Sequence, residues 1–235
     1  MKHTLLIKDW LSSFLSLLFP RCCVVCGRPL AKGEECICTV CNINLPRTNY
    51  HLRKDNPVER LFWGQIPLER ATSFFFYEKG SDFRLILHRL KYGGQKEIGA
   101  IMGRYMAAEL LSSNFFQGID VIIPIPLHKK KQQIRGYNQS EWIARGIAVV
   151  TGIPIDTESI LRKKNTETQT RKSVFERRDN VEGIFELQHP ETLAGKHILI
   201  VDDVLTTGST TLACASCLVD VEDIRISILT LATVE

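Results

Sequence analysis

The sequence predicts an α/β protein in which helices flank a parallel sheet, with a small cysteine-rich module at the N-terminus. Two apolar runs, at residues 121–126 and 198–201, lack the polar alternation of half-exposed strands and are typical of strands covered on both faces. A polar, glycine-containing loop and then a helical stretch follow each run, as in β-loop-α units. Two Cys-x-x-Cys pairs near the N-terminus predict the additional module.

Length and composition limit the number of domains. The chain has 235 residues, of which 44% are hydrophobic, so it can bury one substantial core and carry a small extra module. We place this module in residues 1–55 and the main domain in residues 56–235. The net charge of +4 is too small to indicate a nucleic-acid partner by itself.

Residues 5–19 carry leucine, phenylalanine and tryptophan at a mostly helical spacing. They could be mistaken for a signal peptide, but Lys8 and Asp9 interrupt the apolar run, and no small-residue cleavage site follows. No stretch reaches transmembrane length. We expect an amphipathic helix that packs on its own protein, with a membrane-surface helix or a targeting signal as alternatives. A cytoplasmic protein is then expected.

Cysteines are the strongest signal in the N-terminal quarter. Four of them form the two pairs: Cys23, Cys26, Cys38 and Cys41. Two such turns supply four thiolates for a tetrahedral structural zinc site (Zn²⁺). Cys36 is an alternative ligand in place of Cys38. A thioredoxin-like redox pair is the rival interpretation, but it needs one Cys-x-x-Cys near a βαβ unit rather than two in a loop-rich segment.

The middle of the chain alternates between strand and helix patterns. Residues 42–65 are polar and interrupted by prolines, which indicates a linker. Strand composition follows at residues 71–77, and helical periodicity at 82–92 and 98–111.

The end of the first of these helices is basic. His88 and Lys91 fall on one helix face, and Gly93 with Gly94 ends the helix. One interpretation is a solvated basic helix end. In the other, His88, Lys91 and Tyr92 reach the mouth of an active site.

A basic loop is expected after the apolar run at 121–126, before a helix at 140–150. Such a loop after a parallel strand is a place to hold a highly charged anion, and pyrophosphate is the natural candidate. The candidate contacts are Lys129, Lys130, Arg135, Gly136 and Asn138. A solvated lysine run is the alternative for residues 129–131.

Residues 162–172 are polar and basic, with little apolar content to bury. We expect a flexible lid over a polyphosphate that includes Arg162, Lys163 and Arg171, with a plain surface loop as the alternative. A short helix at 173–180 and a strand at 183–187 should follow.

The stretch at residues 196–211 carries the chemistry. Its strand ends in Asp202 and Asp203, and a loop follows that contains Thr206, Thr207, Gly208, Ser209 and Thr210. Backbone amides and hydroxyls in this loop, with the next helix N-terminus at 211–219, form a monophosphate site. Adjacent carboxylates accept hydrogen bonds from vicinal sugar hydroxyls, so a phosphorylated ribose fits both parts. An ordinary turn with a Ser/Thr helix cap is the alternative.

This stretch resembles the phosphoribosyl pyrophosphate (PRPP) motif of type I phosphoribosyltransferases. Almost the whole chain is similar to the ComF family, which has these motifs in the same order: the double Cys-x-x-Cys, HRLKYGG, PIPL, RGYNQ, TETQTRKSVFERRDN and VDDVLTTGST. The resemblance implies a type I phosphoribosyltransferase fold, PRPP and Mg²⁺ as ligands, and a link to DNA uptake in competence.

The resemblance also implies roles for individual residues. Asp202 and Asp203 would bind the ribose hydroxyls in the region of Mg²⁺, residues 206–210 the 5′-phosphate, and residues 129–138 the pyrophosphate. Departure of pyrophosphate leaves an oxocarbenium-like centre, so catalysis would be chiefly electrostatic and need no nucleophile. Nothing in the sequence identifies the acceptor.

Two classes of function remain open from the sequence. The first is an enzyme that transfers the phosphoribosyl group from PRPP to an unknown acceptor. The second is a competence factor that uses the PRPP pocket as a sensor and contacts single-stranded DNA or DNA-uptake proteins through its basic clusters.

Overall fold

The computed structural model describes residues 20–163 and 183–234. Within these two ranges, no helix combines the length and the apolar character that crossing a membrane requires. The helix expected at residues 5–19, most of the basic segment with Arg171, and the short helix expected at 173–180 lie outside the described residues.

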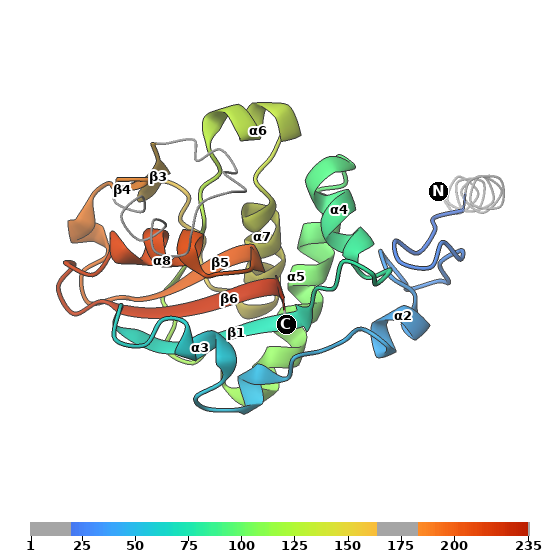
Figure 1. Ribbon diagram of the computed structural model, residues 1–235, viewed down its shortest axis with the longest axis horizontal. Coiled ribbons are helices and arrows are strands. Elements are labelled where there is room, and N and C mark those ends of the chain that lie inside the picture. Colours follow the sequence, from blue (N-terminus) through green and yellow to red (C-terminus); the bar gives the residue numbers. More distant parts are fainter. Residues whose placement is uncertain (1–19, 164–182, 235) are drawn as a thin grey trace, which may run out of the picture.

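A four-stranded parallel sheet forms the centre of the molecule (Figure 1). Its strands lie in the order β1 (Leu68–Phe76), β6 (Arg225–Thr233), β5 (His197–Leu205) and β2 (Val121–Pro124). The α/β class with a parallel sheet is therefore confirmed. β6 has no counterpart among the expected strands, although it is rich in isoleucine, leucine and threonine.

Successive residues of β5 point to opposite faces of this sheet, and helices cover both. On one face, Leu199 and Val201 pack with α4 (Arg84–Tyr92), α5 (Glu97–Leu110) and α7 (Gln139–Thr151). On the other face, Ile198 and Ile200 pack with α3 (Pro57–Arg60) and α8 (Ser209–Ser216). Because both faces of the strand are buried, residues 198–201 form an unbroken apolar run in the sequence.

The cysteine-rich segment and the following residues lie along the α5 side of the sheet. Here the chain forms α2 (Thr39–Ile43) and a 3-10 turn at Tyr50–Leu52. Arg47 donates to Asn42 and pairs with Glu109 of α5 at 2.7 Å, so the segment is fixed to the main body. The boundary expected between residues 55 and 56 stays a prediction.

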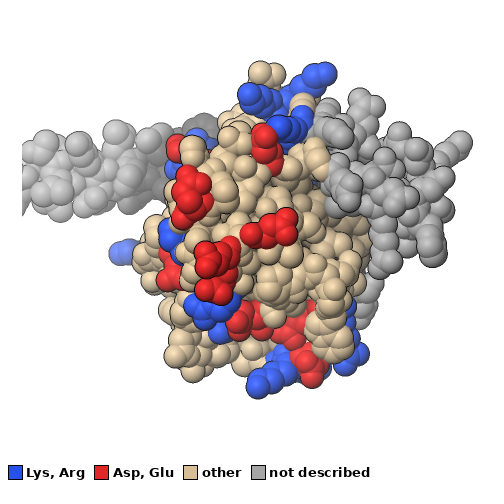
Figure 2. Space-filling model, turned by 90° about the vertical axis from the view of Figure 1, so that its left-hand side faces the viewer, with Lys and Arg blue, Asp and Glu red and all other residues tan. Residues whose placement is uncertain are grey.

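Residues 129–135 form a helix, α6 (Lys129–Arg135), where the sequence analysis expected a loop. The expectation was wrong because lysine, glutamine and arginine are good helix formers even where nothing is buried. His128 caps the start, and Gly136, at φ 79°, ends the helix. α6 projects from the top of the molecule in Figure 1, and Figure 2 shows Lys and Arg side chains gathered at that height.

A separate two-stranded antiparallel sheet lies beside the main sheet (upper left in Figure 1). It pairs β3 (Ile160–Arg162) with β4 (Phe185–Leu187). Arg162 therefore belongs to a strand, not to a loop as expected, and its guanidinium lies 5.3 Å from the ring centre of Phe185. Two further 3-10 turns lie at Leu111–Ser113 and Pro190–Thr192.

Candidate functional site

The two carboxylates near the carboxyl end of β5, which continues to Leu205, are held by groups from different helices. Asp202 Oδ1 accepts hydrogen bonds from Ser140 Oγ at 2.9 Å and from the backbone N–H of Asp203 at 2.8 Å. Asp203 Oδ1 lies 3.0 Å from Lys91 Nζ. Ser140 stands in the first turn of α7 and Lys91 in the last turn of α4. The pair is thus oriented by the helices on one face of the sheet.

The protonation of Asp202 is tuned by its surroundings. Burial, and then the negative charge of Asp203, raise its pKa to about 7. The hydrogen bonds from the Asp203 amide and Ser140, together with the charge of Lys91, act in the opposite direction. Near neutral pH the Asp202 carboxyl therefore lies close to the midpoint of its titration, so a nearby cation or hydroxyl donor will favour the ionised form.

A cavity of about 350 Å³ opens beside this acid pair. Cations from three parts of the chain line it: Lys91, Lys131, Arg135 and Arg162. Burial lowers the pKa of Lys131, and the charges of Arg162, Arg135 and Lys91 lower it further. Mutual repulsion among these cations means that a bound polyanion would be electrostatically favoured.

The segment between α6 and α7 is fixed to its surroundings by side-chain hydrogen bonds. Asn138 Nδ2 donates to Ile125 O at 3.0 Å, and Asn138 Oδ1 caps α7. Tyr137 donates its hydroxyl to Leu90 O of α4 at 2.6 Å. Arg135 donates to Gln139 Oε1 at 2.6 Å, which holds its guanidinium at the cavity.

The loop after the acid pair turns into α8 at Gly208. Gly208 has φ 75°, a backbone conformation that side chains rarely adopt. A Cβ built there would lie 3.4 Å from the Phe62 ring, at the edge of ordinary van der Waals contact, so the positive φ is the main reason for a glycine at this turn. Thr206 and Thr210 line the cavity, and the hydroxyls of Thr207 and Ser209 lie 2.9 Å apart.

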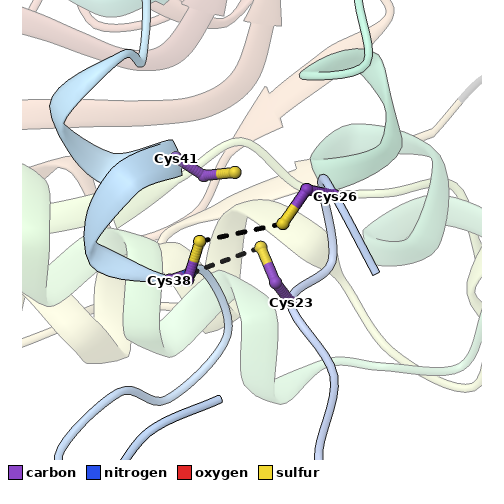
Figure 3. Close-up of side chains that lie close together, drawn as sticks. All are labelled: Cys23, Cys26, Cys38 and Cys41. Carbon is purple, nitrogen blue, oxygen red and sulfur yellow. Dashed lines mark hydrogen bonds between the residues drawn. The ribbon is translucent and has the colours of Figure 1, made fainter. Parts of the chain in front are cut away.

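The four paired cysteines form a compact cluster (Figure 3). In Figure 1 the segment that carries them lies to the right of α4 and α5, and α8 lies to the left. The sulfur atoms of Cys23, Cys26, Cys38 and Cys41 all lie within 4.8 Å of one another. Cys26 Sγ and Cys38 Sγ are 3.8 Å apart. Cys38 N donates to Cys23 Sγ at 3.3 Å. Arg28 donates to Cys26 Sγ at 3.4 Å and lowers the pKa of that thiol to about 6.

Cys36 lies apart from this cluster. Its Sγ contacts Met102 Sδ at 3.8 Å, and burial raises the pKa of the thiol to about 12. A buried, protonated thiol packs as a small apolar side chain and is a poor metal ligand. Of the two alternatives left by the sequence, the structure therefore places Cys38 in the cluster.

Comparisons with known proteins decide the family. No family model matches the chain. The DNA utilization protein YhgH of Escherichia coli O157:H7 is 32% identical over 209 residues, which cover 83% of this chain and 88% of that protein. The competence protein ComFC of Bacillus subtilis strain 168 is 26% identical over 216 residues, covering 90% of this chain and 83% of that protein. The chain belongs to the ComF family.

The fold that the ComF resemblance implies is the one described above: a parallel sheet flanked by helices, with a cysteine cluster near the N-terminus. A solved adenine phosphoribosyltransferase from Leishmania tarentolae aligns with 80% of the ComF chain, over 94% of that protein, at 12% identity and a TM-score of 0.38. A likeness this weak says nothing about the site.

In this ComF chain, some of the residues expected to bind phosphate groups lie around one cavity. Arg135, Asn138 and Arg162 line the acid-pair cavity with Thr206 and Thr210. Lys129 and Lys163 instead line a neighbouring cavity of about 550 Å³. Neither cavity is lined by Lys130 or Gly136, which are exposed, and Arg171 lies outside the described residues.

Some cavity residues of the ComF chain were missed or left open by the sequence analysis. Lys131 and Ser140 were not singled out. A place for Lys91 at the mouth of an active site was one of two interpretations of the basic helix end. Once residues 129–135 are taken as a helix, their spacing would predict that Lys131 accompanies Arg135, because residues 131 and 135 share one helix face. Residues 129 and 132 share another face and line the neighbouring cavity. No local pattern identifies Ser140.

Proposed function

We propose that this ComF chain binds PRPP in the acid-pair cavity and transfers its phosphoribosyl group to an acceptor with release of pyrophosphate. The observation that carries the proposal is the composition of one cavity, which combines a carboxylate pair, a threonine-rich loop at a helix N-terminus and four cations. Each part matches one part of PRPP: the ribose hydroxyls, the 5′-phosphate and the pyrophosphate.

The charges in the cavity also suit the reaction. The bond between C1 of the ribose and the pyrophosphate oxygen breaks as the acceptor forms its bond to C1. Positive charge then develops on the ribose and negative charge on the leaving group. Asp202 and Asp203 stand where the ribose would lie, whereas Lys131 and Arg135 face the space for the pyrophosphate. Preorganised charges of both signs lower the barrier without a covalent intermediate.

Mg²⁺ fits the same place. Carboxylate oxygens are hard ligands of the kind that Mg²⁺ takes together with substrate phosphates, and Asp202 with Asp203 offers them at the cavity wall. When bound, the ion would neutralise charge on the departing pyrophosphate. The binding of Mg²⁺ and PRPP should therefore be mutually dependent.

We further propose that the cysteine cluster holds a structural zinc ion. Four sulfurs at about 2.3 Å from zinc in a tetrahedron lie about 3.8 Å from one another, and the Cys26–Cys38 sulfur distance is 3.8 Å. Metal analysis of the reduced protein should find about one zinc per chain. Cys38→Ser should lose it and Cys36→Ser should retain it. Zinc that depends on Cys36 instead would contradict this ligand set.

A pyrophosphate-release assay tests the transferase proposal. The protein is incubated with PRPP, Mg²⁺ and a panel of amine, amide and nucleobase acceptors, and inorganic pyrophosphate is measured with time. Acceptor-dependent release that Asp202→Asn abolishes is the expected result. PRPP binding with no release for any acceptor would support a PRPP sensor, and no PRPP binding at all would contradict both proposals.

A second candidate function is single-stranded DNA binding, favoured by the surface at the cavity mouth. α6 exposes Lys129 and Lys130 to solvent, Ile134 is 85% exposed, and Tyr92 on α4 is 69% exposed. Cations interleaved with an aromatic ring suit a backbone with stacked bases. The names of the relatives, DNA utilization protein and competence protein, point the same way. Affinity that falls steeply with salt and with Tyr92→Ala would support this function.

The cysteines also bear on the compartment. None of the eight forms a disulfide, and cysteines outside disulfides are typical of a reducing compartment. We therefore propose that the protein works in the cytoplasm, where PRPP would be its small-molecule partner and DNA-uptake proteins its candidate macromolecular partners.

A further inference from the structure

The neighbouring cavity of about 550 Å³ directly adjoins the acid-pair cavity. Residues of β3 and β4 line one part of it, and residues of α6 and the start of α7 line another. In Figure 1, β3 and β4 lie to the left of α6. The two cavities share four lining residues: Pro126, Leu127, Asn138 and Arg162. A molecule in the neighbouring cavity would therefore lie next to a ligand of the acid pair.

Two of the shared residues are held by contacts of their own. Asn138 Nδ2 donates to Ile125 O at 3.0 Å, and Asn138 Oδ1 caps α7. The guanidinium of Arg162 lies over the Phe185 ring. Burial lowers the pKa of Arg162, and the negative charge of Asp202 opposes this effect. The charge of Arg162 is thus balanced from the acid-pair side of the shared wall.

The charges of the two cavities differ. Apart from Arg162, the charged residues around the neighbouring cavity are two lysines and two glutamates: Lys129, Lys163, Glu141 and Glu186. Lys163 Nζ pairs with Glu186 Oε1 at 2.5 Å. In the acid-pair cavity, four cations stand against two carboxylates. An excess of cations suits a polyanion, whereas balanced charges suit a neutral ligand.

The two glutamates indicate which polar groups this ligand carries. Glu141 Oε1 accepts from Arg145 at 2.7 Å, and Glu186 Oε1 accepts from Lys163. In the part of the chain that the structure describes, no donor reaches the second oxygen, Oε2, of either glutamate. Ionised carboxylates only accept hydrogen bonds, so the ligand has to supply N–H or O–H donors.

The size and the apolar surface of the neighbouring cavity indicate the shape of the ligand. A volume of about 550 Å³ is ordinary for a small-molecule site. Ammonia, with about the ~30 Å³ that a water molecule occupies, would leave it almost empty. Apolar residues supply much of the wall: Pro124, Pro126, Leu127, Ile160 and Leu161. A flat ring with N–H donors at its edge fits such a space.

We propose that the neighbouring cavity holds the acceptor, and that the acceptor is a neutral, flat nitrogen heterocycle with an exocyclic amino group. Glu141, one turn after Asn138 on α7, accepts from the amino group. A ring nitrogen reaches C1 of the ribose past Asn138 and Arg162. This nitrogen bonds to C1, the bond from C1 to pyrophosphate breaks, and the proton of the nitrogen leaves with the pyrophosphate. This inference rests on the proposed transfer.

A comparison of acceptors tests the chemical class. Pyrophosphate release from PRPP with Mg²⁺ is measured for adenine and cytosine, for hypoxanthine and uracil, which have an oxygen in place of the amino group, and for the anion orotate. The kcat/KM of each amino-bearing base should exceed that of its oxo counterpart by at least about 10-fold, because an oxo group leaves the carboxylate without a donor. Orotate should be the poorest acceptor. Equal rates for adenine and hypoxanthine, or the fastest release with orotate, would overturn the class.

Two adjacent glutamines test the location. Gln132 and Gln133 are both exposed on α6, but only Gln132 lines the neighbouring cavity, and Gln133 lines neither of the two. Gln132→Trp should fill part of the space and lower acceptor-dependent release by at least about 10-fold, because the acceptor is displaced from C1. Its Kd for PRPP should stay within about 2-fold of the wild type. Gln133→Trp should match the wild type in both measurements. Equal release by the two variants would overturn the location.

Glu141→Gln tests the contact with the amino group. The amide keeps the size but replaces an acceptor atom with a donor, so the KM for adenine should rise by about 10-fold while kcat changes less. The preference for adenine over hypoxanthine should shrink. Arg145→Gln is the matched control, because it breaks the same ion pair and leaves the carboxylate in place. It should keep the wild-type KM. An equal rise in KM in both variants would overturn the role of Glu141.

Failure of this inference differs from failure of the proposed function. Release of pyrophosphate with simple amines or amides but with none of the five ring compounds would leave the transfer intact and overturn the heterocycle. A wild-type protein that binds no PRPP, or that releases no pyrophosphate with any acceptor, would contradict the proposed transfer itself.

Discussion

The two ends of β5 both bury polar side chains, but they do so in different ways. At the amino end, His197 is 1% exposed. Its Nδ1 lies 3.1 Å from Gly118 O and its Nε2 lies 2.8 Å from Ser227 Oγ. The His197 N–H donates to Asp120 Oδ2 at 2.8 Å. Every polar atom of this side chain has a protein partner, so the amino end is a closed network.

The carboxyl end of the same strand is open. Burial acts on both ends in favour of the neutral form: it lowers the pKa of His197 and raises that of Asp202 to about 7. Only the carboxyl end combines a carboxylate oxygen that faces a cavity with cations that repel one another. Burial and a shifted pKa therefore do not by themselves mark a functional site. The feature that distinguishes the carboxyl end is the cavity beside its carboxylates.

The largest expected effect comes from removing the charge at the open end. Replacing both Asp202 and Asp203 with Asn keeps their size and should weaken Mg²⁺-dependent PRPP binding by at least about 100-fold, because the ribose and metal contacts are lost. Calorimetry measures the affinity, and circular dichroism with a melting curve checks that the fold persists. Equal affinity in the double variant and the wild type would place PRPP elsewhere.

His197→Ala should affect stability and leave binding unchanged. Removing the ring leaves a cavity and unpaired polar groups on Ser227 and Gly118. We expect the free energy of unfolding to fall by about 2–4 kcal/mol, measured by urea denaturation. The Kd for PRPP should stay within about 2-fold of the wild type. A variant with unchanged stability would show that the amino end is not a structural network.

The two ends should respond to pH with opposite signs. The folded-state pKa of Asp202 is raised, so the stability that its protonated form contributes is complete below about pH 4 and is lost as pH rises to about 7. The pKa of His197 is lowered, so its contribution is present above about pH 6.5 and is lost as pH falls below that value.

Single variants separate these two contributions. Urea unfolding at pH 5 and pH 8 is compared for the wild type, Asp202→Asn and His197→Gln. Asp202→Asn should gain stability relative to the wild type on going from pH 5 to pH 8, because it lacks the charge that the wild type has to bury. His197→Gln should show the reverse trend. If the stability of both variants relative to the wild type changed in the same direction between pH 5 and pH 8, the two ends of β5 would not respond to pH with opposite signs.

The smallest effect is expected at Gly208. Ala at this positive φ should cost about 1 kcal/mol in unfolding free energy. Gly152 is a matched control, because its φ is 74° and nothing lies within 4 Å of an added Cβ. Both Ala variants should lose similar stability, but only Gly208→Ala should weaken binding of ribose 5-phosphate, measured by calorimetry. Equal affinity in both variants would mean that the loop does not hold the phosphate.

Strands with continuous apolar patterns could be predicted from the sequence, and with them the position of Asp202 and Asp203 near the carboxyl end of a strand, although β5 continues to Leu205. The cluster of four cysteines was predictable from spacing. α6 was not, because none of its residues is fully buried and a lysine run carries no hydrophobic period. Its helical form depends on propensity and on the caps at His128 and Gly136.

Contacts between distant segments could not be predicted. Lys91 reaches Asp203 because the parallel order of the strands places α4 beside the end of β5, and no local pattern contains that order. In the sequence, Ser140 is an ordinary residue at the start of a helix. The choice between Cys36 and Cys38 depends on packing against Met102. Tertiary packing decides all three.

A crystal structure with PRPP and Mg²⁺ tests the central claim most directly. The 5′-phosphate should lie in the loop at Thr206 and Thr210, and the ribose hydroxyls should lie at Asp202 and Asp203. The pyrophosphate should lie against Lys131 and Arg135. PRPP bound outside this cavity, or ribose hydroxyls that contact neither Asp202 nor Asp203, would contradict the account.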